Sequence, residues 1–381
     1  MTILSVEVRL LTDAVEFNDI AESWLSSDPF STSILAGMLN GILAGTRGQP
    51  AGTRWIVVLD DGNVVGVAMH TPPYHPFLPR LPAGAAAAVA SVLLATGQEF
   101  TGVTGETASV TAFADSWAAR TGGSSSVAMS MRMYRLGTLT PPVGIPGCPR
   151  RIELSDIELV ADWFGRFHAE ANPHSPAEDP TITAARRIAT DQLWVWERDH
   201  RPVSLAVGTV PVAGVATIAP VYTPPEHRGC GYGAAVTAQA TRACLDAGAR
   251  HVVLYTDLAN PTSNSIYQQI GYLPDHEAQE RQLHPDTANA STVAHAGAAP
   301  AAGTRGTTSG SDRIVVVESD PAWAETAAAL MAELQSALPH MWSSWNTSVA
   351  ARCRDWRPSR LSTSWPRRLT SAGSFRWRTM H

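Results

Sequence analysis

Residues 221–234 read VYTPPEHRGCGYGA and contain the most informative pattern of the chain. It predicts the end of a buried strand, a short turn with two prolines, and three alternate glycines that open a helix. Glycines at such a junction let the backbone approach a ligand closely and present several N–H groups in one concavity. The free N–H groups and positive dipole end of the helix complete an anion site, to which Arg228 can add charge-assisted hydrogen bonds. The stretch therefore predicts a site for the pyrophosphate of a nucleotide-type cofactor.

Two other interpretations of this stretch stay open on the residues alone. One is a glycine-rich turn that binds nothing. The other is a dinucleotide site, because residues 229–234 match the pattern G-x-G-x-x-A and Asp257 ends the next predicted strand. Against the dinucleotide site, residues 224–228 separate the strand from the first glycine. In a dinucleotide-binding unit the strand runs almost directly into that glycine.

A second segment, NPTSNSIYQQIGY at residues 260–272, is not explained by a dinucleotide site. Together the two segments resemble the GNAT acyltransferase superfamily. The family's phosphate-loop pattern is Arg or Gln, two residues, Gly, one residue, then Gly or Ala, and it falls on Arg228, Gly231 and Gly233. Its later pattern is Asn, Tyr seven residues on, then Gly and an aromatic residue, and it falls on Asn260, Tyr267, Gly271 and Tyr272. The resemblance covers residues 150–285, approximately.

The resemblance implies that acetyl-CoA binds as a co-substrate in a cleft where the strand ending near Thr223 splays from its neighbour. The backbone of Val221 and Thr223 would hydrogen-bond the pantetheine arm, and Asn260 would contact the cofactor near the same cleft. Tyr267 would donate a proton or a hydrogen bond to the departing CoA thiolate after direct attack of an amine on the thioester. The pyrophosphate would be held by Arg228 and by the backbone N–H groups of Gly229, Cys230, Gly231, Tyr232, Gly233 and Ala234.

The sequence departs from the family at Cys230, where relatives more often have a basic or small residue. Because the loop binds phosphate through backbone groups, this cysteine is expected to weaken cofactor binding without abolishing it. A Cys230 thiol made reactive by the helix terminus is the alternative. The general base is not identified by the sequence. Glu170, Asp257 and His227 are candidates, and each is also explained as an ordinary surface, strand-end or loop residue.

The chain as a whole predicts an α/β fold of tandem GNAT-like lobes, each a mixed central sheet flanked by helices, followed by a disordered linker and tail. We expect a degenerate lobe over residues 1–137, a linker over 138–149 and the catalytic lobe over 150–285. In the first lobe PRLPAG, at residues 79–84, stands where a phosphate loop is expected. Prolines there remove N–H donors, so this lobe is expected to bind no acyl-CoA and to support or cover the other. An independent ligand-sensing role is the alternative.

The expected elements follow from hydrophobic periodicity and turn residues. Asp60-Asp61-Gly62 is a strong hairpin signal between two apolar runs. The expected strands are 5–10, 55–59, 64–69, 127–136, 192–197, 203–210, 215–223 and 251–257. The expected helices lie between residue 10 and about residue 44, and at 83–96, 106–120, 155–171, 231–247 and 262–270. Trp194 and Trp196 share one face of their strand and are expected in the core, with an acceptor pocket as the alternative.

The C-terminal part of the chain predicts something different. Residues 286–312 are rich in Ala, Gly, Thr and Ser and are expected to form a disordered linker. Residues 313–338 resemble the truncated start of a GrpB-family domain, which has a nucleotidyltransferase-like fold. Residues 339–381 have neither helical nor strand periodicity, and we expect them to be a disordered tail that was translated out of frame. An ordinary basic tail is the alternative.

Composition limits the class of protein. The formal net charge is −6, which argues against a nucleic-acid binder. No apolar run is long enough to span a bilayer and the N-terminus does not resemble a secretory signal, so no membrane partner is expected. Four scattered cysteines indicate a cytoplasmic protein without a disulfide framework or metal site. The expected activity is therefore N-acetyl transfer to an amine of a small molecule or peptide. A non-catalytic acyl-CoA-binding or sensing module is the alternative.

Overall fold

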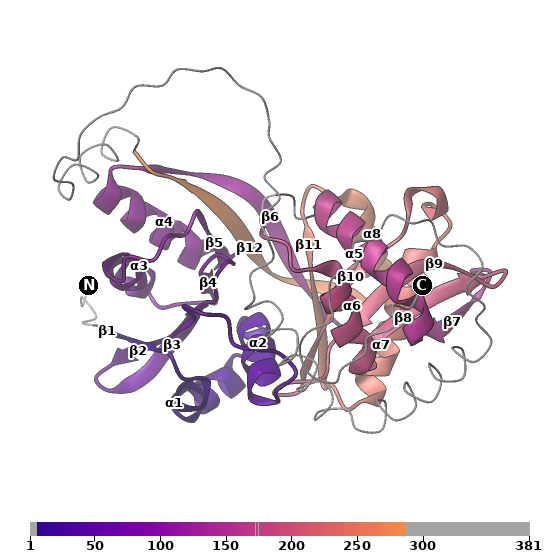
Figure 1. The fold of residues 1–381 in the computed structure, drawn as a ribbon, viewed down its shortest axis with the longest axis horizontal. Coiled ribbons are helices and arrows are strands. Elements are labelled where there is room, and N and C mark those ends of the chain that lie inside the picture. Colours follow the sequence, from indigo (N-terminus) through magenta and orange to yellow (C-terminus); the bar gives the residue numbers. More distant parts are fainter. Residues whose placement is uncertain (1–5, 172, 174, 287–381) are drawn as a thin grey trace, which may run out of the picture. The chain divides into compact units, whose positions relative to one another are not determined.

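The computed structural model describes residues 6–171, 173 and 175–286 (Figure 1). One order of elements occurs twice, namely strand, two helices, three strands, helix, strand, helix and strand. The first copy consists of β1 (Glu7–Leu11), α1 (Ala14–Ser27), α2 (Ser33–Leu43), β2 (Arg54–Asp60), β3 (Asn63–His70), β4 (Phe77–Leu78), α3 (Ala85–Ala95), β5 (Gly102–Glu106), α4 (Thr107–Thr121) and β6 (Ser124–Leu136).

The second copy repeats this order, with one short 3-10 turn before α5 and another before α7. It consists of β7 (Cys148–Arg151), η1 (Leu154–Asp156), α5 (Ile157–Ala171), α6 (Pro180–Ala189), β8 (Leu193–Arg198), β9 (Arg201–Gly208), β10 (Val215–Tyr222), η2 (Pro225–His227), α7 (Tyr232–Asp246), β11 (His251–Asp257), α8 (Pro261–Gln269) and β12 (Tyr272–His284). The tandem α/β fold expected from the sequence is thus present.

The strands form one twelve-stranded sheet in which the two copies exchange their last strands. Its order is β1-β2-β3-β4-β5-β12-β6-β11-β10-β9-β8-β7. Strand β12 of the second copy lies between β5 and β6, and pairs antiparallel with both. Strand β6 of the first copy lies between β12 and β11, and also pairs antiparallel with both. The division into lobes at 1–137 and 150–285 stays a prediction, and each part receives one strand from the other.

Helices cover both faces of this sheet (Figure 1). In the first copy, α3 and α4 pack on one face around Phe113 and Leu93, and α1 and α2 pack on the other around Phe17 and Leu35. In the second copy, α5 and α6 cover the face that includes Tyr222. Helices α7 and α8 cover the opposite face, in a cluster of buried side chains that contains Ala206, Ala216, Ile218, Ala234, Val236, Ala240, Tyr267 and Tyr272.

Local chemistry explains where several elements begin and turn. Asp61 and Gly62 have φ angles of 48° and 80°, and two consecutive positive φ values are what the tight turn of the β2–β3 hairpin requires. Asp13 caps α1 by accepting the backbone N–H of Val15 at 2.7 Å. The hairpin predicted from Asp60-Asp61-Gly62 is therefore confirmed.

The expected C-terminal linker, GrpB-like start and tail fall outside the described residues, apart from Asp286. Within the described residues, no helix is long and apolar enough to cross a membrane. Five strands and helices were not predicted from the sequence. They are β4, β5, β7, α6 and β12, and the start of β7 falls within the expected linker at 138–149.

Candidate active site

The candidate site lies where β10 separates from β11. The two strands run parallel and pair at only three positions, the last being Thr217 with Val253. Both continue beyond this point, to Tyr222 and to Asp257, and there β10 pairs only with β9 on its other side. A register shift between Ile218 and Val221 marks the divergence. The edge of β10 that faces β11 is thus left without a strand partner over its second half, as the resemblance implied.

The glycine-rich loop follows directly and ends in α7. Gly229 and Gly231 have φ angles of 75° and 81°, a left-handed conformation that a residue with a Cβ adopts only with strain. Gly231 is the N-cap of α7 and no side chain caps the helix. Within the described part of the chain, no group outside α7 accepts a hydrogen bond from the backbone N–H groups of residues 229–234. These N–H groups and the positive end of α7 form a cradle for an anion.

The strand end and the loop are packed against each other. The Thr223 hydroxyl lies 2.8 Å from the Ser204 hydroxyl of β9. A Cβ at Gly233 would lie 3.3 Å from the Thr223 hydroxyl, and a Cβ at Gly231 would lie 2.5 Å from Ile145 in the segment between β6 and β7. A residue with a Cβ at position 231 would displace the flexible end of the Ile145 side chain and would also be strained by the positive φ.

Arg228 ties the loop to α5. Its Nε donates to the Thr223 carbonyl at 2.9 Å and its Nη2 donates to the Glu170 carboxylate at 2.6 Å. The Tyr222 hydroxyl also donates to Glu170, at 3.2 Å. The guanidinium, predicted to add hydrogen bonds to the pyrophosphate, is therefore engaged in holding the loop, and half of the side chain is exposed.

The other predicted loop residues differ in exposure. Cys230 is exposed at the surface of the loop. Tyr232 is buried, and its hydroxyl accepts a hydrogen bond from Arg198 at 2.8 Å. Ala234 is buried in the core under α7, whereas Val221 is partly buried at its edge. The side chains of Tyr232, Ala234 and Val221 thus contribute mainly packing, whereas that of Cys230 does not.

Asn260 is the N-cap of α8, at the carboxyl end of β11. Its side-chain oxygen accepts the backbone N–H of Ser263 at 3.0 Å, which satisfies one of the free donors of the helix. Since β10 and β11 are parallel, Asn260 lies at the same edge of the sheet as Thr223 and the loop. The structure therefore brings the two predicted motifs to one edge, and it uses the Asn260 oxygen for capping.

Tyr267 lies on α8 and is only 9% exposed. Burial raises the pKa of its phenol to about 12, and hydrogen bonding to Ser263 partly opposes this shift. Its ring packs against Tyr134 of β6 and Tyr272 of β12, with centroids 6.5 and 6.3 Å away. The Tyr134 hydroxyl donates to Asn264 of α8 at 2.9 Å and accepts from Gln268 at 3.1 Å.

Tyr134 thus brings a side chain of the first copy into the core of the second, beside the predicted general acid. The sequence indicated a strand here, because residues 127–136 alternate. Nothing in that alternation showed that the strand pairs with β11.

The three candidates for the general base lie near the site in different environments. Glu170 is bound to Arg228 and Tyr222. Asp257 ends β11 and accepts the backbone N–H of Ala259 at 2.8 Å. His227 is partly exposed in η2, next to the loop. Trp194 and Trp196 are partly buried against the cluster under α7, which favours their predicted place in the core.

The corresponding region of the first copy is closed. Strand β4 pairs with β5 over its whole length, with Leu78 opposite Gly105. Gly105 approaches the Leu78 carbonyl so closely that no Cβ fits between them. The Leu81 N–H, in the segment equivalent to the loop, donates to the Ser109 hydroxyl at 3.0 Å. Here the strands do not splay and a backbone donor is used internally.

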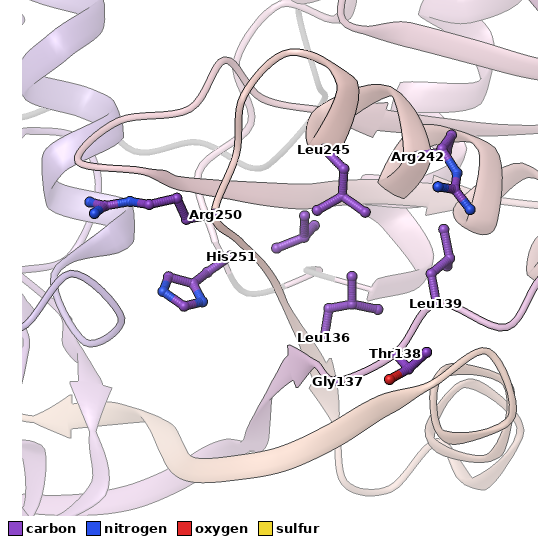
Figure 2. A pocket seen from close by; sticks show the side chains of 9 residues that line it. Leu136, Gly137, Thr138, Leu139, Arg242, Leu245, Arg250 and His251 are labelled. Carbon is purple, nitrogen blue, oxygen red and sulfur yellow. The ribbon is translucent and has the colours of Figure 1, made fainter.

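A surface pocket lined by residues of both copies lies elsewhere (Figure 2). It is lined by Leu136 at the end of β6, by Arg242 and Leu245 near the end of α7, and by the start of β11. Ten residues of helix, about 15 Å, separate Arg242 from the loop at the other end of α7. Figure 2 shows Leu136 and Leu245 pointing toward one another and Arg250 pointing away. This pocket is distinct from the site at the β10–β11 edge.

Comparison with known proteins agrees with this geometry. The model of the acetyltransferase (GNAT) family matches residues 157–272, a segment that begins with α5 and includes the loop and α8. This match supports the GNAT resemblance of the second copy. The GrpB resemblance remains a prediction. A search among curated proteins finds no match.

Two solved structures share the fold across both copies. A GCN5-related N-acetyltransferase from Sphaerobacter thermophilus is 14% identical, with a TM-score of 0.50, and the match covers 74% of this chain and 96% of that one. A Drosophila protein is 10% identical, with a TM-score of 0.53, over 74% of this chain and 99% of that one. At these identities the likeness concerns the fold.

Among the described residues, no group of three or more His, Cys, Asp or Glu side chains could hold a metal ion.

Proposed function

We propose that the second copy binds acetyl-CoA and transfers its acetyl group to an amine. The observation that carries this proposal is the divergence of β10 from β11 beside a row of free N–H groups at the start of α7. A cleft of this form can take an extended arm along β10 and an anion at the helix terminus. The family match over residues 157–272 supports acetyl transfer in general.

The residues divide the binding task between them. Acetyl-CoA supplies an acyl group activated as a thioester. The N–H groups of residues 229–234 would hold the pyrophosphate, and the free edge of β10 at Val221, with Thr223 beyond it, would hydrogen-bond the pantetheine arm. Arg228 would fix the loop through Glu170 and add positive charge beside it. Asn260 would set the start of α8 next to the cofactor.

The residues must also move a proton. Attack by the amine forms a C–N bond and breaks the C–S bond, so the amine gives up one proton and the thiolate takes one up. Tyr267, with a pKa of about 12, keeps its proton at neutral pH and can donate it. The proton of the amine would go to Glu170, Asp257 or His227, directly or through water. Positioning and proton transfer are the main contributions of the protein.

The acceptor in this proposal is an amine of a small molecule or peptide. The decisive experiment is incubation of the full chain with labelled acetyl-CoA and a library of amines, in which CoA release and product mass are both measured. Transfer gives release together with a product heavier by one acetyl group. Binding of acetyl-CoA without either signal would favour the alternative, a non-catalytic acyl-CoA-binding module.

A further inference from the structure

A buried carboxylate lies near the proposed active site without a cation that balances it. Glu280, on β12, is only 8% exposed. Its two carboxylate oxygens accept long hydrogen bonds of 3.4 and 3.3 Å from the Ser175 hydroxyl, which lies between α5 and α6. His75, between β3 and β4, is the single basic side chain of the described residues within 4.0 Å, with its Nε2 3.7 Å from Glu280.

His75 does not neutralise this carboxylate at neutral pH. Burial lowers the pKa of the imidazole below its usual value near 6.5, and the attraction of Glu280 opposes this only in part. The His75 Nε2 atom is itself buried and has no hydrogen-bond partner within the described residues. A buried carboxylate that faces a neutral ring and one hydroxyl is costly unless a cation joins it.

The strand pairing places Glu280 close to the divergence of β10 from β11. Just past the end of β11, the Leu258 N–H donates to the Ser130 carbonyl of β6 at 2.8 Å. Ser130 is paired with Gln279 on β12, the neighbour of Glu280. Two strand spacings therefore separate the carboxyl end of β11 from this part of β12, a distance of about 10 Å.

Ser175, which contacts Glu280, follows closely after Glu170 of α5, which binds the cofactor loop. Glu170 binds Arg228 of that loop, and five residues later Ser175 contacts Glu280. Five residues span at most about 18 Å when fully extended. Glu280 is therefore within reach of a small molecule whose other end lies beside the thioester.

We propose that Glu280, with Ser175 and His75, binds a second ammonium group of the acceptor, so that the acceptor is a diamine or another amine with two basic groups. This inference rests on the proposed function. The amine that reacts must be deprotonated when it attacks, whereas a fixed buried carboxylate holds its partner as an ammonium. Glu280 therefore suits the amine that does not react. The His75 Nε2 and the Ser175 hydroxyl supply further polar contacts around the same group.

The test is titration calorimetry of the full chain saturated with CoA. The probes are straight-chain diamines, with diols of equal length as uncharged controls. Glu280→Gln keeps the shape of the side chain and removes its charge. Glu277→Gln is the matched control, because Glu277 lies on the same strand, is exposed, and binds Arg132 at the surface.

We expect diamines to bind better than diols, and Glu280→Gln to weaken diamine binding by about tenfold to a hundredfold, as loss of a buried charge partner does. Acetyl-CoA binding should be unchanged in Glu280→Gln, and Glu277→Gln should behave like the wild type. Diamine binding that is equal in Glu280→Gln, or no better than diol binding, overturns the inference. Failure to bind acetyl-CoA would instead remove the proposed function, which the same titrations measure separately.

Discussion

The Arg228 guanidinium donates to the Glu170 carboxylate at 2.6 Å and thereby fastens the glycine-rich loop to the end of α5. The same guanidinium bonds the Thr223 carbonyl at the end of β10. One side chain therefore joins the three elements that surround the predicted pyrophosphate site. This relationship suggests that Arg228 serves the cofactor mainly by shaping the loop.

The first prediction concerns this side chain. Arg228→Met should weaken acetyl-CoA binding by roughly tenfold, because the loop loses its tether and one positive charge. Stability should change by only about 0–1 kcal/mol, since the ion pair is half exposed. Calorimetry and thermal melts measure the two quantities. Arg166→Met is the control, because Arg166 forms an exposed ion pair with Asp162 within α5. Equal loss of affinity in both variants would refute this role.

Gly231 should be needed for cofactor binding. Alanine at this position meets a backbone strain of roughly 1–2 kcal/mol from the positive φ, and it also displaces the flexible end of the Ile145 side chain. We expect Gly231→Ala to raise the dissociation constant for acetyl-CoA by about tenfold or more. Gly62→Ala is the control, because Gly62 has a similar φ of 80° in a hairpin with open space around it. It should cost stability and leave acetyl-CoA binding intact; if both variants bind normally, the loop is not the site.

Tyr267 should affect turnover more than affinity. If it is the general acid, Tyr267→Phe should lower kcat by on the order of tenfold to a thousandfold while acetyl-CoA affinity hardly changes. Tyr272→Phe is the control, because it removes another buried hydroxyl, bonded to Thr241 at 2.7 Å, and should cost about 1 kcal/mol of stability with normal kcat. An unchanged kcat in Tyr267→Phe would leave this residue a packing role only.

The pH dependence provides a second test of Tyr267. A general acid must be protonated, and the pKa of this phenol is raised to about 12. Its proton is therefore present throughout the neutral range and is lost only as the pH approaches that value. The wild-type kcat should show no loss of the acid between neutral pH and about pH 10. A fall in kcat with an apparent pKa near 8 or 9, absent from Tyr267→Phe, would contradict the assignment.

The exchanged strands predict that the first copy does not fold alone. Residues 1–137 lack β12, which lies between β5 and β6 and pairs with both. This fragment should show no cooperative urea transition, because β5 and β6 cannot close the gap themselves. Coexpression with residues 138–286 should restore a soluble complex. A cooperative transition of the isolated fragment would show that the exchange is dispensable.

Much of this fold could be predicted from local signals. The β2–β3 hairpin, the loop before α7 and strand β11 follow from turn residues, glycines and apolar runs. Strand β12 could not be predicted, because residues 272–284 are largely polar and contain Pro274. Its place between β5 and β6 comes from tertiary pairing that no periodicity encodes. Strands β5 and β4 also lacked a strand pattern, because β5 has two glycines in five residues and β4 has only two residues.

The residues of the candidate site also include some that the sequence could identify and some that it could not. Residues 228–233 and Tyr267 stand in recognisable spacings, so the sequence could propose them. Glu280, His75 and Ser175 are far apart along the chain and belong to no motif. The insertion of β12 between β5 and β6 places Glu280 beside His75 of the first copy. The sequence also did not predict the ion pair between Arg228 and Glu170, because nothing in the sequence connects Glu170 to the loop.

The most direct test of the central claim is titration of the full chain with acetyl-CoA and, separately, with NAD. We predict one acetyl-CoA per chain, because the loop of the second copy has free N–H groups and the equivalent segment of the first copy is closed, and we predict no binding of NAD. Binding of NAD without binding of acetyl-CoA would contradict the account and favour a dinucleotide site at residues 229–234.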